Sequence, residues 1–240
     1  MKENIRENSY SLLAVSFIIA LSTLLTLTAC SSDDTAASKV APASTGTYTD
    51  TRDGHIYGWV RYGNLEWMTE NLQYDIKDKV NSSIYQPINN FASNTDTTNL
   101  AKYGRLYTLS GAQTACPDGW RVPTDADWQN LEQALGMSAS DASQYEWRGN
   151  VASSMLTLQG DTCALNMKLG GFYDKFVVGG NTNWRFMGAF AFYWTSTQGN
   201  AKTGLYYFYR KLAYNRTDVY RQSMIPNSNM LSVRLVRDIQ

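Results

Sequence analysis

Histidine is almost absent from this chain of 240 residues, where His55 is the only one. His55 falls inside a predicted strand beside a turn, so catalytic triads, histidine-rich metal sites and imidazole acid–base catalysis all lack parts. We expect His55 to be structural. A glycine-rich phosphate loop, heptads and solenoid repeats are also lacking. These absences predict a protein that is not an enzyme and that uses no cofactor or metal.

An excess of charge of either sign is missing as well. The 21 basic and 21 acidic residues cancel to a net charge of zero, which excludes the electrostatic attraction typical of nucleic-acid-binding proteins. The carboxylates are scattered, and Asp125 and Asp127 fit a helix start better than a pair of glycosidase acids. We therefore expect neither a nucleic-acid partner nor hydrolysis of glycosidic bonds.

Long hydrophobic runs are limited to one, at residues 12–29, preceded by Lys2 and Arg6. This layout is typical of a secretory signal, and Leu27-Thr28-Ala29-Cys30 resembles the lipobox of bacterial lipoproteins. The resemblance implies a signal peptide over residues 1–29 and acylation of Cys30, which would attach the protein to a membrane. The alternative, an uncleaved transmembrane anchor, leaves Cys30 unexplained.

The residues after Cys30 form a tether. Residues 30–46 are small, polar and contain proline, so we expect a flexible linker followed by one domain over residues 47–240. Ser31-Ser32-Asp33-Asp34 resembles the surface-export signals of Bacteroidetes lipoproteins, although an ordinary polar tether fits it as well. We expect an outer-membrane lipoprotein, with exposure on the cell surface as the favoured orientation.

The clearest helix signal follows Pro123. Thr124 is placed as the N-cap, Trp128, Leu131 and Leu135 recur on one face, and Gly136 supplies the stop. Strands are predicted at residues 55–62, 65–72 and 231–236, and the first and last of these could pair. The domain is therefore expected to be α+β.

A series of motifs then resembles one family, the Fibrobacter succinogenes major paralogous domain. This resemblance implies a C-type lectin-like fold with antiparallel sheets, two main helices, paired termini and a long irregular loop region. The motifs occur in the order expected for the family: Asp53-Gly54, WMTENL (67–72), YGRLYT (103–108), CPDGWRVPT (116–124), Trp128, FYWTST (192–197) and SVRLV (232–236).

The motif tryptophans, Trp67, Trp120, Trp128 and Trp194, are expected to be core residues, against the alternative of a ligand-stacking row. Calcium-dependent lectins of the wider fold carry short Glu-Pro-Asn or Trp-Asn-Asp motifs. Neither occurs in this sequence, so no calcium site is expected.

Two cysteines remain in the domain, Cys116 and Cys163. An exported protein favours a disulfide between them, but relatives often carry a cysteine where this chain has Leu235, which leaves Cys116 without its usual partner. A free pair stays open, as does a copper-holding pair like that of the related formylglycine-generating oxidases. The surrounding motifs of those enzymes are missing here.

Ligand binding is expected in residues 171–188, interpreted as the variable loop of the lectin-like fold. The alternative is that its aromatic residues only cover the core. The second candidate, residues 206–209, reads as a strand with one side buried. The predicted ligand-binding residues are Tyr173, Asp174, Asn181, Asn183, Trp184 and Arg185.

The leading function from sequence is a non-catalytic binding or adhesion module for a glycan or a protein. A structural subunit of an envelope or fimbrial assembly is the first alternative. A divergent formylglycine-generating-type oxidase is the second.

Overall fold

The computed structural model describes residues 40–85, 97–157, 163–176, 183–199 and 205–239. The chain divides into two units, Met1–Ala37 and Ser38–Gln240, and all described residues belong to the second. The predicted signal peptide, Cys30 and most of the linker therefore lie outside the described residues. Within the linker, Ala43 donates a backbone hydrogen bond to Arg61 and the first strand begins at Thr45, so the ordered domain starts earlier than residue 47.

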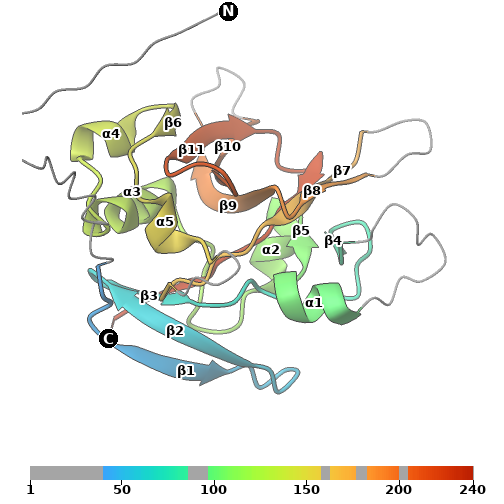
Figure 1. The fold of residues 1–240 in the computed structure, drawn as a ribbon. Coiled ribbons are helices and arrows are strands. Elements are labelled where there is room, and N and C mark those ends of the chain that lie inside the picture. Colours follow the sequence, from blue (N-terminus) through green and yellow to red (C-terminus); the bar gives the residue numbers. More distant parts are fainter. Residues whose placement is uncertain (1–39, 86–96, 158–162, 177–182, 200–204, 240) are drawn as a thin grey trace, which may run out of the picture. The chain divides into compact units, whose positions relative to one another are not determined.

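Helices and strands are mixed along the described chain (Figure 1). The described elements are, in order, β1 (Thr45–Thr49), β2 (Ile56–Tyr62), β3 (Leu65–Met68), β4 (Ser82–Ser83), α1 (Thr97–Tyr103), β5 (Leu106–Tyr107), α2 (Leu109–Ala115), α3 (Asp125–Ala134), α4 (Ala139–Ser143), β6 (Glu146–Arg148), α5 (Ala152–Met155), β7 (Gly170–Asp174), β8 (Trp184–Met187), β9 (Phe190–Gln198), β10 (Tyr207–Ala213), β11 (Val219–Met224), β12 (Asn229–Met230) and β13 (Val236–Asp238).

The α+β prediction with antiparallel sheets is confirmed. The prediction of two main helices is wrong: the described residues form five helices, of which only α3 reaches ten residues. Within the part of the chain that the structure describes, no helix is both long and apolar enough to span a membrane.

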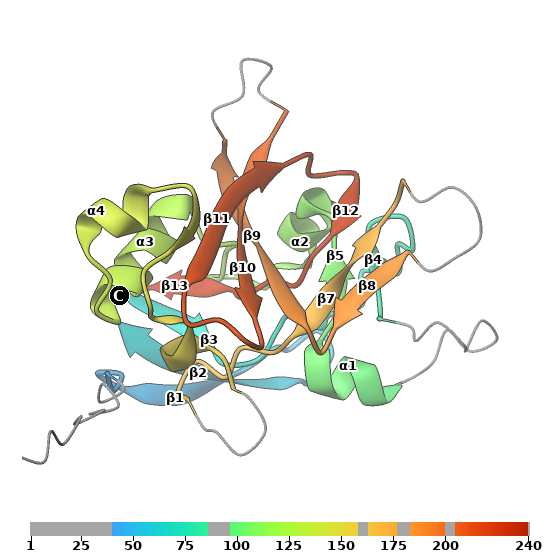
Figure 2. The ribbon, with the colours of Figure 1, turned by 45° about the horizontal axis from the view of Figure 1, so that its top comes forward.

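A four-stranded sheet brings the two ends of the domain together. Its order is β1-β2-β3-β13, and Val236 of β13 lies opposite Trp67 of β3. The expected pairing of the strand at residues 55–62 with the last strand is wrong: β2 lies between β1 and β3, and β13 pairs with β3 instead (Figure 2). The strand predicted at residues 231–236 is shifted to Val236–Asp238: Leu231 and Ser232 form isolated bridges, and Val233 and Leu235 accept single backbone hydrogen bonds from Leu72 and Met68.

A larger, seven-stranded sheet has the order β12-β7-β9-β10-β11-β6, with β8 added on the outer part of β7. Neighbouring strands are antiparallel except for β7 and β9, which meet in parallel at Gly171 and Ala191. Figure 2 shows β9, β10 and β11 side by side, with β7 and β8 forming an arm on one side.

Helix α3 forms as its local signals predict. Thr124 accepts a hydrogen bond from the Asp127 backbone while the Asp127 carboxylate accepts one from the Thr124 backbone, which is a complete capping box. Trp128 and Leu131 face the core, and Gly136 takes the left-handed φ of 107° that follows the helix. The prediction of this helix is confirmed.

The four motif tryptophans are core residues, as predicted. Trp67 and Trp128 are at most 1 % exposed and meet edge to face at 5.1 Å, in the cluster between α3 and the sheets. Trp194 and Trp120 lie in a second cluster, where the Trp194 indole N–H donates to the Tyr107 carbonyl at 2.8 Å. The alternative of a ligand-stacking row of these tryptophans is therefore excluded.

A buried ion network joins α3 to the large sheet. Glu132, which is 0 % exposed, accepts hydrogen bonds from Arg210 of β10 at 2.7 Å and from Arg148 of β6 at 2.6 Å. Asp125 accepts from Arg210 at 2.7 Å and from Arg221 of β11 at 2.7 Å. Burial alone would raise the pKa of Asp125, but the two guanidinium groups outweigh it and lower that pKa. Asp125 therefore does more than begin a helix.

Arg234 is fully buried and pairs with no carboxylate among the described residues. It donates to the Asn71 side chain at 2.8 Å and to the backbone carbonyls of Met68, Leu165 and Asn166 at 2.9, 2.7 and 2.7 Å. Burial lowers its pKa, because removal from water disfavours the charged form. The arginine of the SVRLV motif thus connects its own segment by hydrogen bonds to residues 68–71 and to residues 165–166.

Candidate functional site

The segment predicted as a variable binding loop contains two paired strands. β7 and β8 form an antiparallel pair with Tyr173 opposite Trp184 and Phe172 opposite Arg185. The prediction of an irregular loop over residues 171–188 is therefore wrong at both of its ends, because alternating aromatic residues there suit a pleated strand. Asn181 lies outside the described residues.

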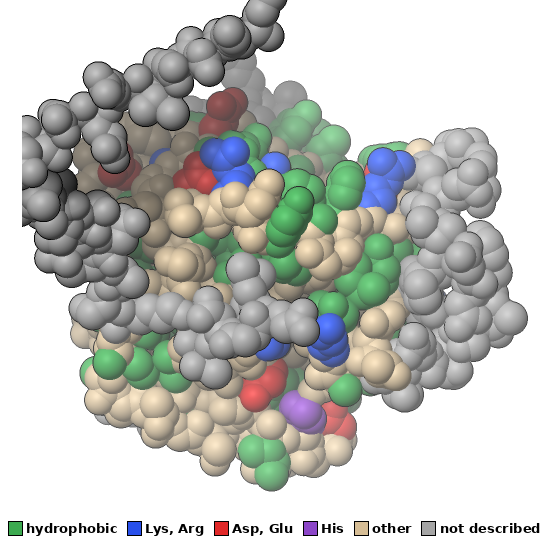
Figure 3. Space-filling model, in the orientation of Figure 1, with side chains coloured by type: hydrophobic (Ala, Val, Ile, Leu, Met, Phe, Trp, Pro, Cys, Tyr) green, Lys and Arg blue, Asp and Glu red, His purple; other side chains and the backbone are tan. Residues whose placement is uncertain are grey.

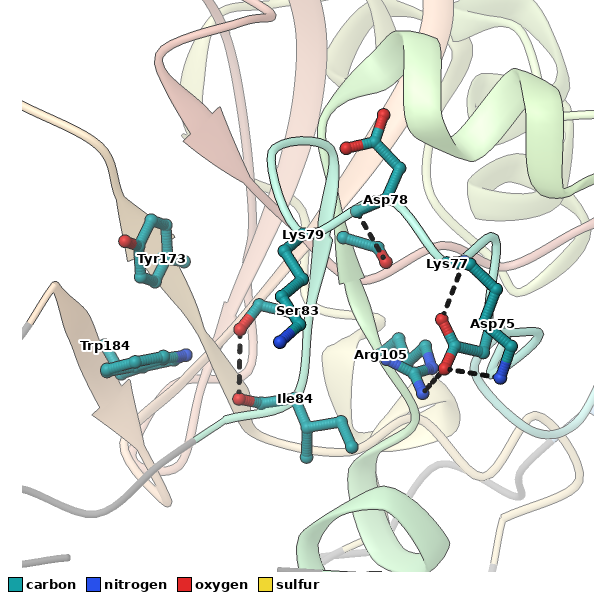
Figure 4. A pocket seen from close by; sticks show the side chains of 10 residues that line it. Asp75, Lys77, Asp78, Lys79, Ser83, Ile84, Arg105, Tyr173 and Trp184 are labelled. Carbon is teal, nitrogen blue, oxygen red and sulfur yellow. Dashed lines mark hydrogen bonds and ion pairs between the residues drawn. The ribbon is translucent and has the colours of Figure 1, made fainter. Parts of the chain in front are cut away.

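A pocket of about 360 Å³ lies between this strand pair and the segment that includes β4 (Figure 4). Two of the predicted ligand residues, Tyr173 and Trp184, line it. Its full lining is Asp75, Lys77, Asp78, Lys79, Ser82, Ser83, Ile84, Arg105, Tyr173 and Trp184.

One wall of the pocket is aromatic. The rings of Tyr173 and Trp184 meet edge to face with centroids 5.0 Å apart, and the Asn183 amide donates to the Tyr173 hydroxyl at 3.1 Å. The indole N–H of Trp184 is buried and has no acceptor among the described residues. Figure 4 shows both rings on the same side of the hollow, facing the charged side chains across it.

The opposite wall is charged and held in place by its own hydrogen bonds. Asp75 accepts from the Lys77 backbone at 2.9 Å and forms an ion pair with Arg105 at 2.8 Å. Burial would raise the pKa of Asp75, but the Lys77 N–H and the Arg105 cation outweigh it, so that pKa is lowered. Lys77 itself has a φ of 58°, a left-handed conformation that is uncommon outside glycine.

Asp78 is stabilised as a carboxylate in the same way. Its side chain accepts hydrogen bonds from the Asn81 amide at 2.7 Å and from the Val80 backbone at 2.8 Å, and these lower its pKa. Lys79 next to it is exposed, and its ammonium has no hydrogen-bond or ion-pair partner within the described ranges. The pocket therefore combines two ionised carboxylates with one unengaged cation.

Three of the predicted ligand residues do not line the pocket. Asn183 is used to hold Tyr173, Asp174 accepts from the Phe176 backbone at 3.0 Å, and Arg185 lies 3.8 Å from Asp174. Residues 75–84 and Arg105 were not predicted as ligand-binding residues from the sequence. The closely spaced charges of Asp75, Lys77, Asp78 and Lys79 were the available signal for that wall.

Cys116 and Cys163 are free thiols, and the structure has no disulfide bond between them. They pack against different hydrophobic clusters, Cys116 beside the one that contains Leu235 and Cys163 beside the other. Leu235 is fully buried in the cluster beside Cys116. Burial raises the pKa of Cys116 to about 11, which makes its thiol unreactive near neutral pH.

The remaining candidates belong to the framework. His55 stacks edge to face on Tyr57 with centroids 4.4 Å apart. The strand predicted at residues 206–209 is present from Tyr207 onward as part of β10, but the prediction that one side is buried is wrong, because neighbouring Phe208 and Tyr209 are both buried. No three His, Cys, Asp or Glu side chains lie close enough to hold a metal ion in the described part of the chain.

The fold and the pocket define a mixed α and β domain with a small, open, aromatic and charged recess. The chain belongs to the Fibrobacter succinogenes major domain family, whose model matches residues 60–237. No curated protein and no solved structure matches the chain.

Proposed function

We propose that this protein is a non-catalytic saccharide-binding module with a C-type lectin-like fold, carried on the outer membrane by a lipid on Cys30 and exposed at the cell surface. The observation that carries the proposal is the pair of Tyr173 and Trp184, which faces charged and hydroxyl-bearing side chains across the pocket. A sugar ring has an apolar face and a polar rim, and these two walls complement them.

The state of the acids supports binding over hydrolysis. A glycosidase needs one carboxylic acid with a raised pKa to protonate the leaving oxygen. Asp75 and Asp78 both have lowered pKa values, because N–H groups and cations stabilise their charged forms. They are suited to accept hydrogen bonds from sugar hydroxyls and are poorly suited to donate a proton.

A structural subunit of a larger assembly is the second candidate, favoured by exposed apolar side chains. Phe176 and Phe186 are 70 % and 49 % exposed, and Figure 3 shows hydrophobic side chains gathered on the surface over β7 and β8. A protein partner would cover such residues. Purification of the native protein with a stoichiometric partner, together with no saccharide binding, would favour this candidate.

Replacing Trp184 by Ala is expected to lower saccharide affinity by about 30-fold, because a buried aromatic contact is worth about 2 kcal/mol. The measurement is a glycan array with the intact protein, followed by calorimetric titration of the best binder. Trp147 is the matched control: it is also half-buried but lies on β6, at the far end of the large sheet. Equal affinities of wild type and Trp184→Ala, with the fold intact by circular dichroism, would contradict the proposal.

The lipid anchor has its own test. Cys30→Ala is expected to remove diacylglyceryl modification and to leave an uncleaved precursor, because the acceptor thiol is lost. Mass spectrometry of membrane fractions measures both. Acylation of the Cys30→Ala protein, or cleavage of the wild type at another site, would overturn the lipoprotein assignment.

A further inference from the structure

The charge balance of the pocket narrows the chemical class of saccharide that it can bind. Three cations line it, Lys77, Lys79 and Arg105, against the two carboxylates of Asp75 and Asp78. A fourth cation, Lys175, donates from its ammonium to the Val80 carbonyl at 3.1 Å, beside the same segment. The recess is therefore positive although the whole chain is neutral.

The two carboxylates are already engaged by the protein. Asp75 is bound by both neighbouring cations, at 2.8 Å from Arg105 and 3.2 Å from the Lys77 ammonium. Asp78 accepts two N–H groups of its own loop. The charge of Asp75 is thus offset by two cations, and the Asp78 carboxylate is directed toward donors of its own loop.

Lys79 is the cation that remains. Figure 4 shows its side chain extending into the space between Trp184 and Arg105, with the ammonium among the lining groups. It has neither a hydrogen bond nor an ion pair to any described residue, whereas Lys77, Arg105 and Lys175 all have one. An ammonium that lines the pocket and pairs with no described anion is suited to bind one from the ligand.

We infer that the saccharide bound in this pocket is acidic, a uronic or similar carboxylated sugar whose ring packs on Tyr173 and Trp184 while its carboxylate pairs with Lys79. The inference rests on the proposed saccharide-binding function. It adds the chemical class of the ligand and the residue that selects it.

The test compares matched ligands that differ only in the carboxylate, such as oligogalacturonate against oligogalactose and glucuronate oligomers against glucose oligomers. The intact protein, purified from membranes in mild detergent, is expected to bind the acidic member of each pair at least about 10-fold more tightly at low salt. Lys79→Ala should weaken binding of the acidic member about 10-fold more than binding of the neutral member and so remove the preference, while Lys79→Arg should retain it. Lys102→Ala is the control, since Lys102 is an exposed lysine of α1 that does not line this pocket.

Three results would overturn the inference, and they differ in whether the proposed saccharide-binding function is retained. Equal binding of acidic and neutral sugars, unchanged in Lys79→Ala, removes the acidic class and keeps the saccharide-binding function. Stronger binding of sulfated than of carboxylated oligomers of equal charge would show that the anionic group that the pocket prefers is not a carboxylate. Absence of binding to any saccharide by the folded protein removes both the inference and the function on which it rests.

Discussion

Replacing Glu132 by Gln is expected to lower the free energy of unfolding by about 3–5 kcal/mol, the usual result of removing one partner of a buried ion pair. Glu132 lies fully buried between Arg148 and Arg210, at 2.6 and 2.7 Å. The amide keeps the shape but not the charge, so Arg148 loses its carboxylate partner, and Arg210 and Arg221 are left to share the single carboxylate of Asp125. Urea denaturation followed by fluorescence measures the difference.

Glu146→Gln is the matched control, because Glu146 is exposed and should change stability by no more than about 0.5 kcal/mol. The pH dependence of the free energy of unfolding gives a second measurement of the same ion network. Asp125 has a lowered pKa in the folded state, so its contribution is present above its unfolded pKa of about 3.9 and is lost as the pH falls through the folded value. A loss below about 1 kcal/mol in Glu132→Gln would show that the network is not needed for stability.

Replacing Arg234 by Met is expected to cost about 3 kcal/mol or more, because two buried carbonyls lose their donor at about 1–3 kcal/mol each and a third, partly buried carbonyl loses its donor as well. Those carbonyls belong to Met68, Leu165 and Asn166. Relief of the buried charge offsets part of this cost, and methionine retains much of the packing. Thermal unfolding monitored by circular dichroism provides the measurement.

Arg216→Met is the control for Arg234, since Arg216 is 43 % exposed and its ion pair with Asp218 lies at the surface. This substitution is expected to leave the melting temperature close to that of the wild type. Similar melting temperatures for Arg234→Met and the wild type would mean that the buried guanidinium is dispensable. The SVRLV arginine would then need another explanation.

The parts of the fold that could be predicted were those with local causes. Helix α3 follows from Thr124, Asp127 and Gly136, whose effects act within a few residues. The burial of Trp128 and Trp194 was predictable because large aromatic rings gain most from leaving water. In each case neighbouring residues and general hydrophobicity were enough.

The pocket could be predicted only in part, because its walls come from distant segments. Tyr173 and Trp184 were identified from their composition, but Asp75 and Arg105 meet them only through the packing of β4, β5 and β7. The ion network was hidden for the same reason: Asp125 and Arg210 are 85 residues apart. Single-sequence patterns report spacing along the chain and carry little information on such long-range pairs.

The pairing of β3 with β13 also bears on when the chain can fold. β3 can pair with β2 early, but its other neighbour, β13, and the donor to the carbonyls that Arg234 satisfies are missing until residues 234–238 have been synthesised. Pairs so far apart in sequence form slowly, and a chain still emerging from the ribosome cannot complete this core. That delay suits a polypeptide whose first residues resemble an export signal, because translocation through a narrow secretory channel requires a chain that has not yet folded.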